Sequence, residues 1–412
     1  MKRAGHWIGL GTACALAFAL VGCGGGDADS ASSGHDFASG GSNVVDVSVG
    51  PGPDAATEDT FNIPTVSVTV CKPGTSTCVT VDHVLVDTGS SGLRLMASVI
   101  SSLGLTNMAD SANSSNTIAE CLPFADGYSW GPVTTADVTI GGESASDIPV
   151  HVIDDSSSYS PTIPTDCTSN GTALDSVTAF DANGVLGVGV YNKDCSTYCV
   201  THADNGYYFT CSSSTCTGTA LALDSQVANP VASFGTDNNG VILQMPSIAA
   251  TGATTASGYL VFGIGTESNN KLESATVLTT DAYGEFTTTF DSQTLSSSFI
   301  DSGSNGLYFP DSSLATCSGN SDFYCPSTTQ SLTATNKGQN SKTSTVSFQI
   351  ANIDNISGDD YAIDDVGGGA ASVQGLGTDY FDWGLPFFYG RTVFTAIEDM
   401  SAGSATGPYY AY

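Results

Sequence analysis

Asp87-Thr88-Gly89-Ser90-Ser91-Gly92-Leu93-Arg94 follows the apolar run Val84-Leu85-Val86. Far downstream, Phe299-Ile300 leads into Asp301-Ser302-Gly303-Ser304-Asn305-Gly306-Leu307-Tyr308. Each copy begins with apolar residues and an Asp. The Asp is followed by either Thr or Ser, and then by Gly-Ser, one polar residue and Gly-Leu. A single Asp-x-Gly is a common turn. Two copies behind strand-like runs indicate a tandem duplication that brings two carboxylates together.

Length and composition predict two β lobes. A chain of 412 residues is long for one hydrophobic core. Charged residues make up only 12%, and there are 47 Gly with many Ser, Thr and β-branched residues, which favours strands and turns over helices. We expect an N-terminal β lobe at 43–250 and a C-terminal β lobe at 251–412, divided in a Ser/Thr/Ala-rich link.

The chain is strongly acidic, with a formal net charge of −32 from nine Lys and Arg against 41 Asp and Glu. So few cations cannot form a basic phosphate-binding face, and we expect no nucleic-acid partner. The charge favours solubility. A sharper interpretation is tolerance of acid, where carboxylates become neutral and self-repulsion fades.

The N-terminus predicts export. Lys2-Arg3 precedes an apolar segment at 8–21 that is short for a membrane span. This segment ends in Leu20-Val21-Gly22-Cys23, which resembles the bacterial lipobox and implies a lipoprotein signal peptide at 1–22 and lipidation of Cys23. The alternative is an ordinary signal peptide with an incidental Cys.

The residue after Cys23 is Gly24 rather than Asp, which by the lipoprotein sorting rule implies the outer membrane. Residues 23–42 are rich in Gly, Ser and Asp and predict a flexible tether without a core. The tether would join the lipid anchor to the folded lobes.

Alternating apolar residues predict the strands, and few segments favour helix. The predicted strands include 45–49, 66–70, 81–86, 133–140, 148–153, 184–189, 240–244, 258–263, 286–290 and 346–350. A short helix is expected at 97–105, and 220–229 is the best further helix candidate.

The cysteines predict disulfides. Of 12 Cys, Cys14 lies in the signal peptide and Cys23 would carry lipid, which leaves an even number in an exported chain. The expected pairs are Cys71–Cys78, Cys317–Cys325 and Cys121–Cys167. The remaining four could pair nested or sequentially, or hold zinc, although their spacing lacks CxxC pairs; these are Cys195, Cys199, Cys211 and Cys216. We expect no metal and no cofactor.

The five histidines lie in no metal or catalytic motif, and no G-x-S-x-G occurs. We expect them, His151 included, to be ordinary strand or surface residues. The chemistry is therefore expected from the two Asp residues.

Two adjacent carboxyls cannot both ionise freely, so Asp87 and Asp301 would share a proton. The protonated member can donate to a substrate carbonyl while the ionised member takes a proton from water. In each copy the Gly is expected to allow a tight turn, the Thr or Ser before it to hydrogen-bond across a pseudo-twofold axis, and the Ser after it to orient the carboxylate. The residues with these supporting roles are Thr88, Gly89, Ser90, Ser302, Gly303 and Ser304.

Over residues 43–412 the chain resembles the pepsin-like aspartic peptidases, in a bacterial branch. Both motifs match, and three further segments resemble the strand beneath the first loop, the opening strand of the second lobe and its closing segment; these are Val185-Leu186-Gly187, 258–263 and 384–394. The resemblance implies a bilobal β fold with pseudo-twofold symmetry, a cleft between the lobes, and acid-pH endopeptidase activity on extended peptides with Asp87 and Asp301 as the dyad.

The resemblance also implies a flap residue over the cleft, for which Tyr128 is the first candidate and Phe124 the second. Two positions depart from the family pattern. Arg94 stands where the family has Trp, and Asp382-Trp383 stands where it has two aliphatic residues.

The leading hypothesis is thus a lipid-anchored aspartic endopeptidase whose partners are extended polypeptides and, through Cys23, the membrane. A catalytically silent surface protein that binds peptide or glycan is the alternative. An adhesive β-rich surface protein is a third possibility, but it leaves the duplication unexplained. Because one chain supplies both motifs, we expect a monomer.

Overall fold

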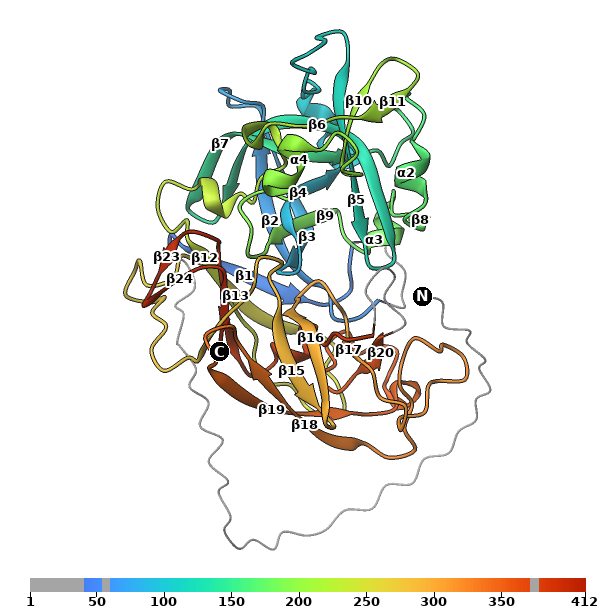
Figure 1. The fold of residues 1–412 in the computed structure, drawn as a ribbon, viewed down its shortest axis with the longest axis vertical. Helices are drawn as coiled ribbons and strands as arrows, with labels where there is room; N and C mark the ends of the chain where they lie inside the picture. Colours follow the sequence, from blue (N-terminus) through green and yellow to red (C-terminus); the bar gives the residue numbers. More distant parts are fainter. Residues whose placement is uncertain (1–40, 54–59, 371–377) are drawn as a thin grey trace, which may run out of the picture.

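The computed structural model describes residues 41–53, 60–370 and 378–412, which form a mostly β protein (Figure 1). The predictions for the signal peptide at 1–22, for Cys23 and for nearly all of the tether at 23–42 lie outside these residues. Within the described part of the chain, no helix is long and apolar enough to cross a membrane.

The strands of the N-terminal part of the chain stand mostly in the upper part of Figure 1, and the first and the last of them lie below the others. They are β1 (Val44–Val49), β2 (Pro64–Cys71), β3 (Cys78–Asp87), β4 (Ser91–Met96), β5 (Thr117–Phe124), β6 (Gly127–Ile140), β7 (Glu143–Ile153), β8 (Thr172–Ala173), β9 (Gly184–Val188), β10 (Tyr208–Cys211), β11 (Cys216–Gly218) and β12 (Gly240–Gln244). The short α-helices are α1 (Ala97–Ile100), α2 (Thr165–Thr168), α3 (Val177–Phe180) and α4 (Ser196–Thr201).

The strands of the second half fill the lower part of Figure 1. They are β13 (Ala256–Phe262), β14 (Val277–Thr279), β15 (Phe286–Phe290), β16 (Gln293–Ile300), β17 (Leu307–Phe309), β18 (Gln330–Lys337), β19 (Thr343–Ile350), β20 (Gly367–Gly369), β21 (Asp382–Trp383), β22 (Thr392–Ala396), β23 (Ser401–Ala402), β24 (Ala405–Thr406) and β25 (Tyr409–Ala411).

Two large sheets organise the described residues. One sheet of 16 strands runs through both halves, and at its centre β1 pairs with β2 and β13, β12 with β13 and β22, and β22 with β25. A second sheet of seven strands has the order β19-β18-β15-β16-β21-β17-β20. The expected lobe boundary at 250 falls between β12 and β13, which are hydrogen-bonded neighbours.

The predicted alternation is confirmed where a strand has one buried face. In β2 the side chains of Val66, Val68 and Val70 are buried, while Ser67 between them is exposed. A strand places successive side chains on opposite faces, so the apolar face enters the core. β3 becomes fully buried over its last residues and ends on Asp87 inside the protein.

One of the two helix predictions is wrong. Residues 97–105 contain α1 and a 3-10 turn at Ser101–Leu103. Residues 220–229 form only a 3-10 turn at Leu223–Ser225. The Gln226 side chain donates to the carbonyls of Ser196 and Leu221, and Ala228 forms a bridge with Lys193, so long-range contacts replace local helical bonds.

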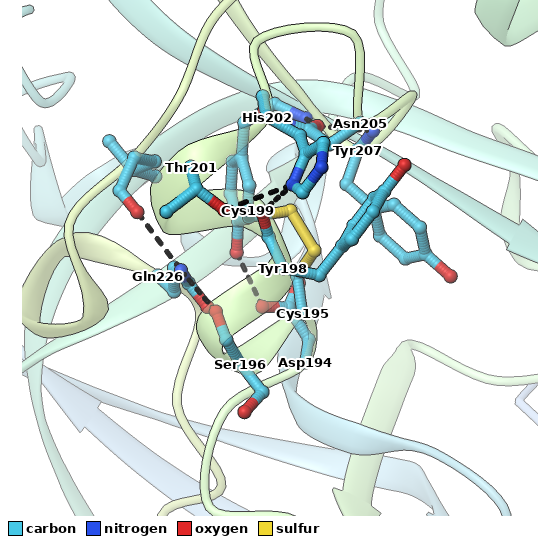
Figure 2. The surroundings of a disulfide bond; sticks show 12 residues. Asp194, Cys195, Ser196, Tyr198, Cys199, Thr201, His202, Asn205, Tyr207 and Gln226 are labelled. Atoms are coloured by element: carbon cyan, nitrogen blue, oxygen red, sulfur yellow. Dashed lines mark hydrogen bonds between the residues drawn. A yellow bond between two sulfur atoms is a disulfide. The ribbon is translucent and has the colours of Figure 1, made fainter. Parts of the chain in front are cut away.

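Five disulfides join the ten cysteines of the described chain. The four cysteines whose pairing was open join sequentially, as Cys195–Cys199 and Cys211–Cys216, which leaves none of them as a free thiolate for zinc. The Cys195–Cys199 disulfide joins the residue before α4 to a residue within α4 (Figure 2). In the same helix the ring of Tyr198 stacks on His202, with ring centroids 4.3 Å apart. Five disulfides favour an oxidising compartment and hence an exported chain.

Candidate active site

The same arrangement of strands carries both motifs. β3 delivers Asp87, β4 follows the loop, and β9 lies between these two strands, parallel to β3 and antiparallel to β4. In the second copy β16 leads to Asp301, β17 follows the loop, and β21 lies between them with the same two directions. The sequence repeat is therefore a repeat of local structure, and Asp382-Trp383 occupies the middle strand of the second copy.

Reciprocal hydrogen bonds lock the two loops together. The Thr88 amide donates to Ser302 Oγ at 3.1 Å, and the Ser302 amide donates to Thr88 Oγ1 at 2.9 Å. Each hydroxyl also donates across the loops, from Thr88 to the Ile300 carbonyl at 3.1 Å and from Ser302 to the Val86 carbonyl at 2.7 Å. All four bonds are buried, so the relative position of the two loops is closely defined.

Thr88→Val is expected to lower the free energy of unfolding by about 2–3 kcal/mol, because it leaves the buried Ser302 amide without an acceptor. Thr80→Val is the matched control, since Thr80 is exposed and shares only a hydroxyl contact with Thr69; the expected loss is under about 0.5 kcal/mol. Urea unfolding measures both. Equal losses in the two variants would show that the interlocked hydroxyls do not stabilise the site.

Both carboxyls accept hydrogen bonds from their own loops. Asp87 accepts from the amides of Gly89 and Ser90 at 2.8 and 3.1 Å and from Ser90 Oγ at 2.5 Å. Asp301 accepts from the Gly303 amide at 2.7 Å and from Ser304 Oγ at 2.9 Å. These donors fix the direction in which each carboxyl points.

Gly89 and Gly303 make room for the opposite carboxyl, which is a different role from the tight turn expected of them. A Cβ on Gly89 would lie 2.5 Å from Asp301 Cγ, and a Cβ on Gly303 would lie 2.8 Å from Asp87 Cγ. Backbone positions without a side chain therefore let the two carboxyls approach each other.

Asp301 keeps its proton to higher pH than an ordinary Asp. Burial raises its pKa well above the ordinary range of Asp, and the neighbouring charges of Asp87 and Asp382 and a side-chain hydrogen bond with Asp87 raise it further. A pair with one proton held at Asp301 can combine a donor and an acceptor at neighbouring oxygens.

Two cavities adjoin the carboxyl pair, and both are lined by Asp87, Asp301 and Phe124. The first, of about 260 Å³, has an apolar aromatic wall; its lining includes Phe61, Ile63, Leu174, Phe180, Tyr308 and Phe323. The lining of the second, of about 750 Å³, includes four tyrosines; they are Tyr191, Tyr207, Tyr283 and Tyr410. Residues from both halves of the chain line each cavity.

The tip of the β5–β6 hairpin, Ala125-Asp126, lines the first cavity together with Asp87 and Asp301. Phe124 lines both cavities. Tyr128, the first flap candidate, lines neither of them, because it is buried in a cluster with Cys121 and Trp130. Phe124, the second flap candidate, therefore faces the site and Tyr128 does not, because the two residues lie on opposite faces of the hairpin.

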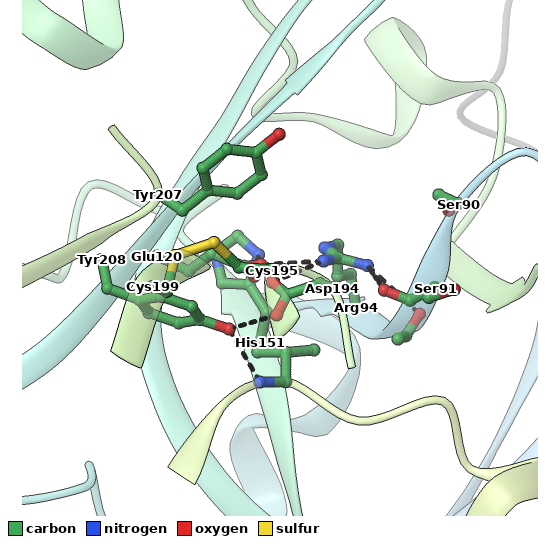
Figure 3. Close-up of polar contacts among 12 residues, drawn as sticks. Ser90, Ser91, Arg94, Glu120, His151, Asp194, Cys195, Cys199, Tyr207 and Tyr208 are labelled. Carbon is green, nitrogen blue, oxygen red and sulfur yellow. Dashed lines mark hydrogen bonds and ion pairs between the residues drawn. A yellow bond between two sulfur atoms is a disulfide. The ribbon is translucent and has the colours of Figure 1, made fainter. Parts of the chain in front are cut away.

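A buried network of charges lies behind the first loop (Figure 3). Arg94 donates to the carbonyls of Ser91 and Gly92 at 3.0 and 3.3 Å, to Glu120 Oε1 at 2.8 Å and to Asp194 Oδ2 at 3.3 Å. It is fully buried. Arg94 thus connects the loop that carries Asp87 to the β5–β6 hairpin and to the segment before α4.

Two more side chains extend this network. His151 Nδ1 lies 2.8 Å from Glu120 Oε2, and Tyr208 donates to Asp194 Oδ1 at 2.6 Å. Burial raises the pKa of Glu120, but the charges of Arg94 and His151 outweigh burial and hold that pKa well below its usual range. Burial and the charge of Glu120 raise the pKa of Asp194, which therefore stays protonated. An ionised Glu120 thus faces Arg94, and a neutral Asp194 completes the hydrogen bonding.

Sequence reasoning did not find this network, since the five residues are far apart in the chain and match no motif. One signal was present: Arg94 lies between Leu93 and Leu95 in a segment whose residues are all buried. A charge on such a strand requires a buried partner. Glu120 is that partner, and His151, expected to be an ordinary histidine, is a second buried partner of Glu120.

Among the described residues, one group could offer three ligand atoms to a metal, namely Cys317, Cys325 and Asp354. Both cysteines are joined in a disulfide, so neither offers a thiolate.

A family model described as "Protein of unknown function (DUF3443)" matches residues 39–412. The chain belongs to this family. No curated protein matches the chain. Among solved structures, it is similar to an aspartic proteinase from Irpex lacteus, with a TM-score of 0.47 and 17% identity over 89% of this chain and 96% of that one.

Proposed function

We propose that this protein is an exported aspartic endopeptidase that hydrolyses extended polypeptides at acid pH. The observation that carries the proposal is the reciprocal bonding of the two Asp-containing loops, which brings one carboxyl from each loop to the same point between two cavities. If the two motifs were only structural turns, there would be no reason for their carboxyls to lie together at the walls of two cavities.

The chemistry follows from the proton held at Asp301. Asp301 donates to the carbonyl oxygen of the scissile amide, while Asp87 takes a proton from a water molecule that attacks the carbonyl carbon. The resulting diol collapses as the C–N bond breaks, and the leaving nitrogen receives a proton from the carboxyl pair. No covalent enzyme intermediate is formed.

The cavities on the two sides of the carboxyls support an extended substrate, because residues on both sides of the cleaved bond then have space for their side chains. In this proposal the lobes 43–250 and 251–412 each supply one carboxyl and act as a monomer. Export, cleavage before Cys23, lipidation and an outer-membrane location rest on residues 1–24 and belong to the same proposal.

Asp87→Asn is expected to lower the rate of peptide cleavage about a thousandfold, because the amide cannot accept a proton from water. The assay follows an unfolded protein substrate from pH 2 to 7, with and without pepstatin. Asp46→Asn, which changes an exposed carboxyl of β1, is the control and should cleave like the wild type. If Asp87→Asn and the wild type give the same cleavage, or none, at every pH, the peptidase proposal fails.

A catalytically silent peptide- or glycan-binding protein remains the second candidate. Phe124 favours it, because the aromatic residue that the hairpin brings to the carboxyls has no hydroxyl to donate to a bound peptide. Wild-type protein that binds peptides or glycans but does not cleave them would support this alternative.

A further inference from the structure

A third carboxyl, that of Asp382, lies directly behind the pair. Asp382 is in β21, between Phe299 of β16 and Tyr308 of β17. Only 2% of the residue is exposed, and its Oδ1 atom is buried without a hydrogen-bond partner. An ionised carboxylate with an unpaired buried oxygen is costly, so this position favours a neutral carboxyl.

Ser304 connects Asp382 to the pair. Its hydroxyl donates to Asp301 Oδ2 at 2.9 Å, and its side chain also lies close enough to Asp382 to act on the pKa of that carboxyl. A hydroxyl has one proton to donate but can accept from another group. When Ser304 donates to Asp301, a hydrogen bond between Ser304 and Asp382 therefore needs a proton from Asp382.

The other polar groups around Asp382 do not replace this arrangement. The titratable groups that act on it or feel its charge are Asp87, Asp301, Tyr308 and Tyr380. The hydroxyl of Tyr308 donates to Asn305 Oδ1 at 2.7 Å, and the hydroxyl of Tyr380 donates to the Ala370 carbonyl. Both phenol protons are used elsewhere, which leaves Ser304 as the polar partner.

We propose that Asp382 is a third functional carboxyl, a positioning residue that stays protonated and donates to Ser304, so that Ser304 donates to Asp301. The chain of bonds is Asp382 carboxyl to Ser304 Oγ to Asp301 Oδ2. It fixes the orientation of the Ser304 hydroxyl, which could otherwise point to either carboxyl.

The electrostatics of the site agree with this geometry. Burial raises the pKa of Asp382 well above the usual range and outweighs the opposing effect of the Ser304 side chain, and the charge of Asp87 raises this pKa further. Ionisation of Asp382 would place a second negative charge near Asp301 and raise the pKa of Asp301 in turn. The three carboxyls therefore titrate as a coupled set.

The protonation of Asp382 can be tested without any assay of activity. In the full chain labelled with ¹³C at the Asp carboxyls and assigned through the backbone, the Asp382 signal should remain that of the protonated form at pH values where the signals of exposed Asp residues are already those of the carboxylate. Titration of Asp382 together with the exposed Asp residues would overturn the proposal.

The effect on rate rests on the proposed peptidase function, and two substitutions separate a positioning role from simple packing. In D382N the side-chain amide can still donate to Ser304 but cannot ionise. Without a negative charge at position 382 the pKa of Asp301 is lower. The alkaline limb of kcat/KM, which follows the loss of the proton from Asp301, should therefore move to lower pH. D382L has no group that can donate to Ser304. Its kcat should be about tenfold below that of D382N, because one lost hydrogen bond costs about 1.4 kcal/mol, and its KM should be similar.

D365N is the matched control. Asp365 is likewise buried with an unpaired Oδ1 but lines neither cavity at the carboxyl pair, so its substitution should leave the alkaline limb where it is. If D382N and D382L both keep the wild-type limb and have equal kcat, Asp382 only fills space and the proposal is wrong. Wild-type protein without cleavage would overturn the proposed function instead, and the Asp382 titration would still decide this proposal.

Discussion

Arg94→Met lowers the free energy of unfolding by about 3–5 kcal/mol, the usual cost of breaking a buried ion pair on one side. The variant leaves the ionised Glu120 without the cation that stabilises it, in a place where both side chains are completely buried. It also removes the donors to the carbonyls of Ser91 and Gly92, next to the residues that orient Asp87. Urea or thermal unfolding measures the loss.

A double-mutant cycle distinguishes this account from a loss of packing. Glu120→Gln added to Arg94→Met should recover about 2 kcal/mol, because it removes the stranded charge. Arg391→Met is the matched single control. Arg391 is only half-buried, with hydrogen bonds to backbone carbonyls and a cation–π contact with Phe387, and should cost about 1 kcal/mol. No recovery in the double variant would mean that the buried charge is not what destabilises the protein.

The protein is expected to be more stable at pH 5 than at pH 8, with a melting temperature that falls by about 5 °C or more across this range. Burial, the largest cause in each case, raises the pKa of Asp194, Asp301 and Asp382 well above the ordinary range and that of Asp365 to about 6. At pH 5 the folded chain therefore binds more protons than the unfolded chain. Stability that depends on this difference is lost as the pH rises through the folded pKa values.

Among the residues that the structure describes, the one buried carboxyl whose pKa is lowered, Glu120, does not change this result between pH 5 and 8. The pKa of Glu120 is lowered, so its contribution is already complete above the pKa of the unfolded state and is lost only at much lower pH. Self-repulsion at a net charge of −32 acts in the same direction as the raised carboxyls. Scanning calorimetry from pH 4 to 8 tests the trend, with Asp365→Asn expected to flatten it. A melting temperature that rises toward pH 8 would contradict it.

The parts of the site that local sequence describes could be predicted. Each Asp follows an apolar strand and precedes Gly and Ser, so the carboxyls, their strands and their hydroxyl partners could be read from a short window. The middle strand beneath the first loop was also visible, as Val185-Leu186-Gly187. The mostly β character follows from the alternation of apolar residues.

The rest depends on contacts between distant segments. The choice between Phe124 and Tyr128 depends on which face of the hairpin meets the carboxyls, and composition cannot give that face. The Arg94 network draws on five separate segments. Residues 220–229 have fair helical propensity, but buried long-range contacts determine their conformation. Asp382 was visible as a departure from an aliphatic pattern, and only the structure places it behind Ser304.

The central strands impose an order on folding. β12 pairs with β22, and the bonds that align the carboxyl loops join residues 212 to 216 positions apart. Contacts of such separation form late, because the intervening chain must first lose its conformational freedom. The carboxyls therefore meet only after most of the chain is available to fold, and a chain that is still unfolded carries neither the assembled pair nor its cavities.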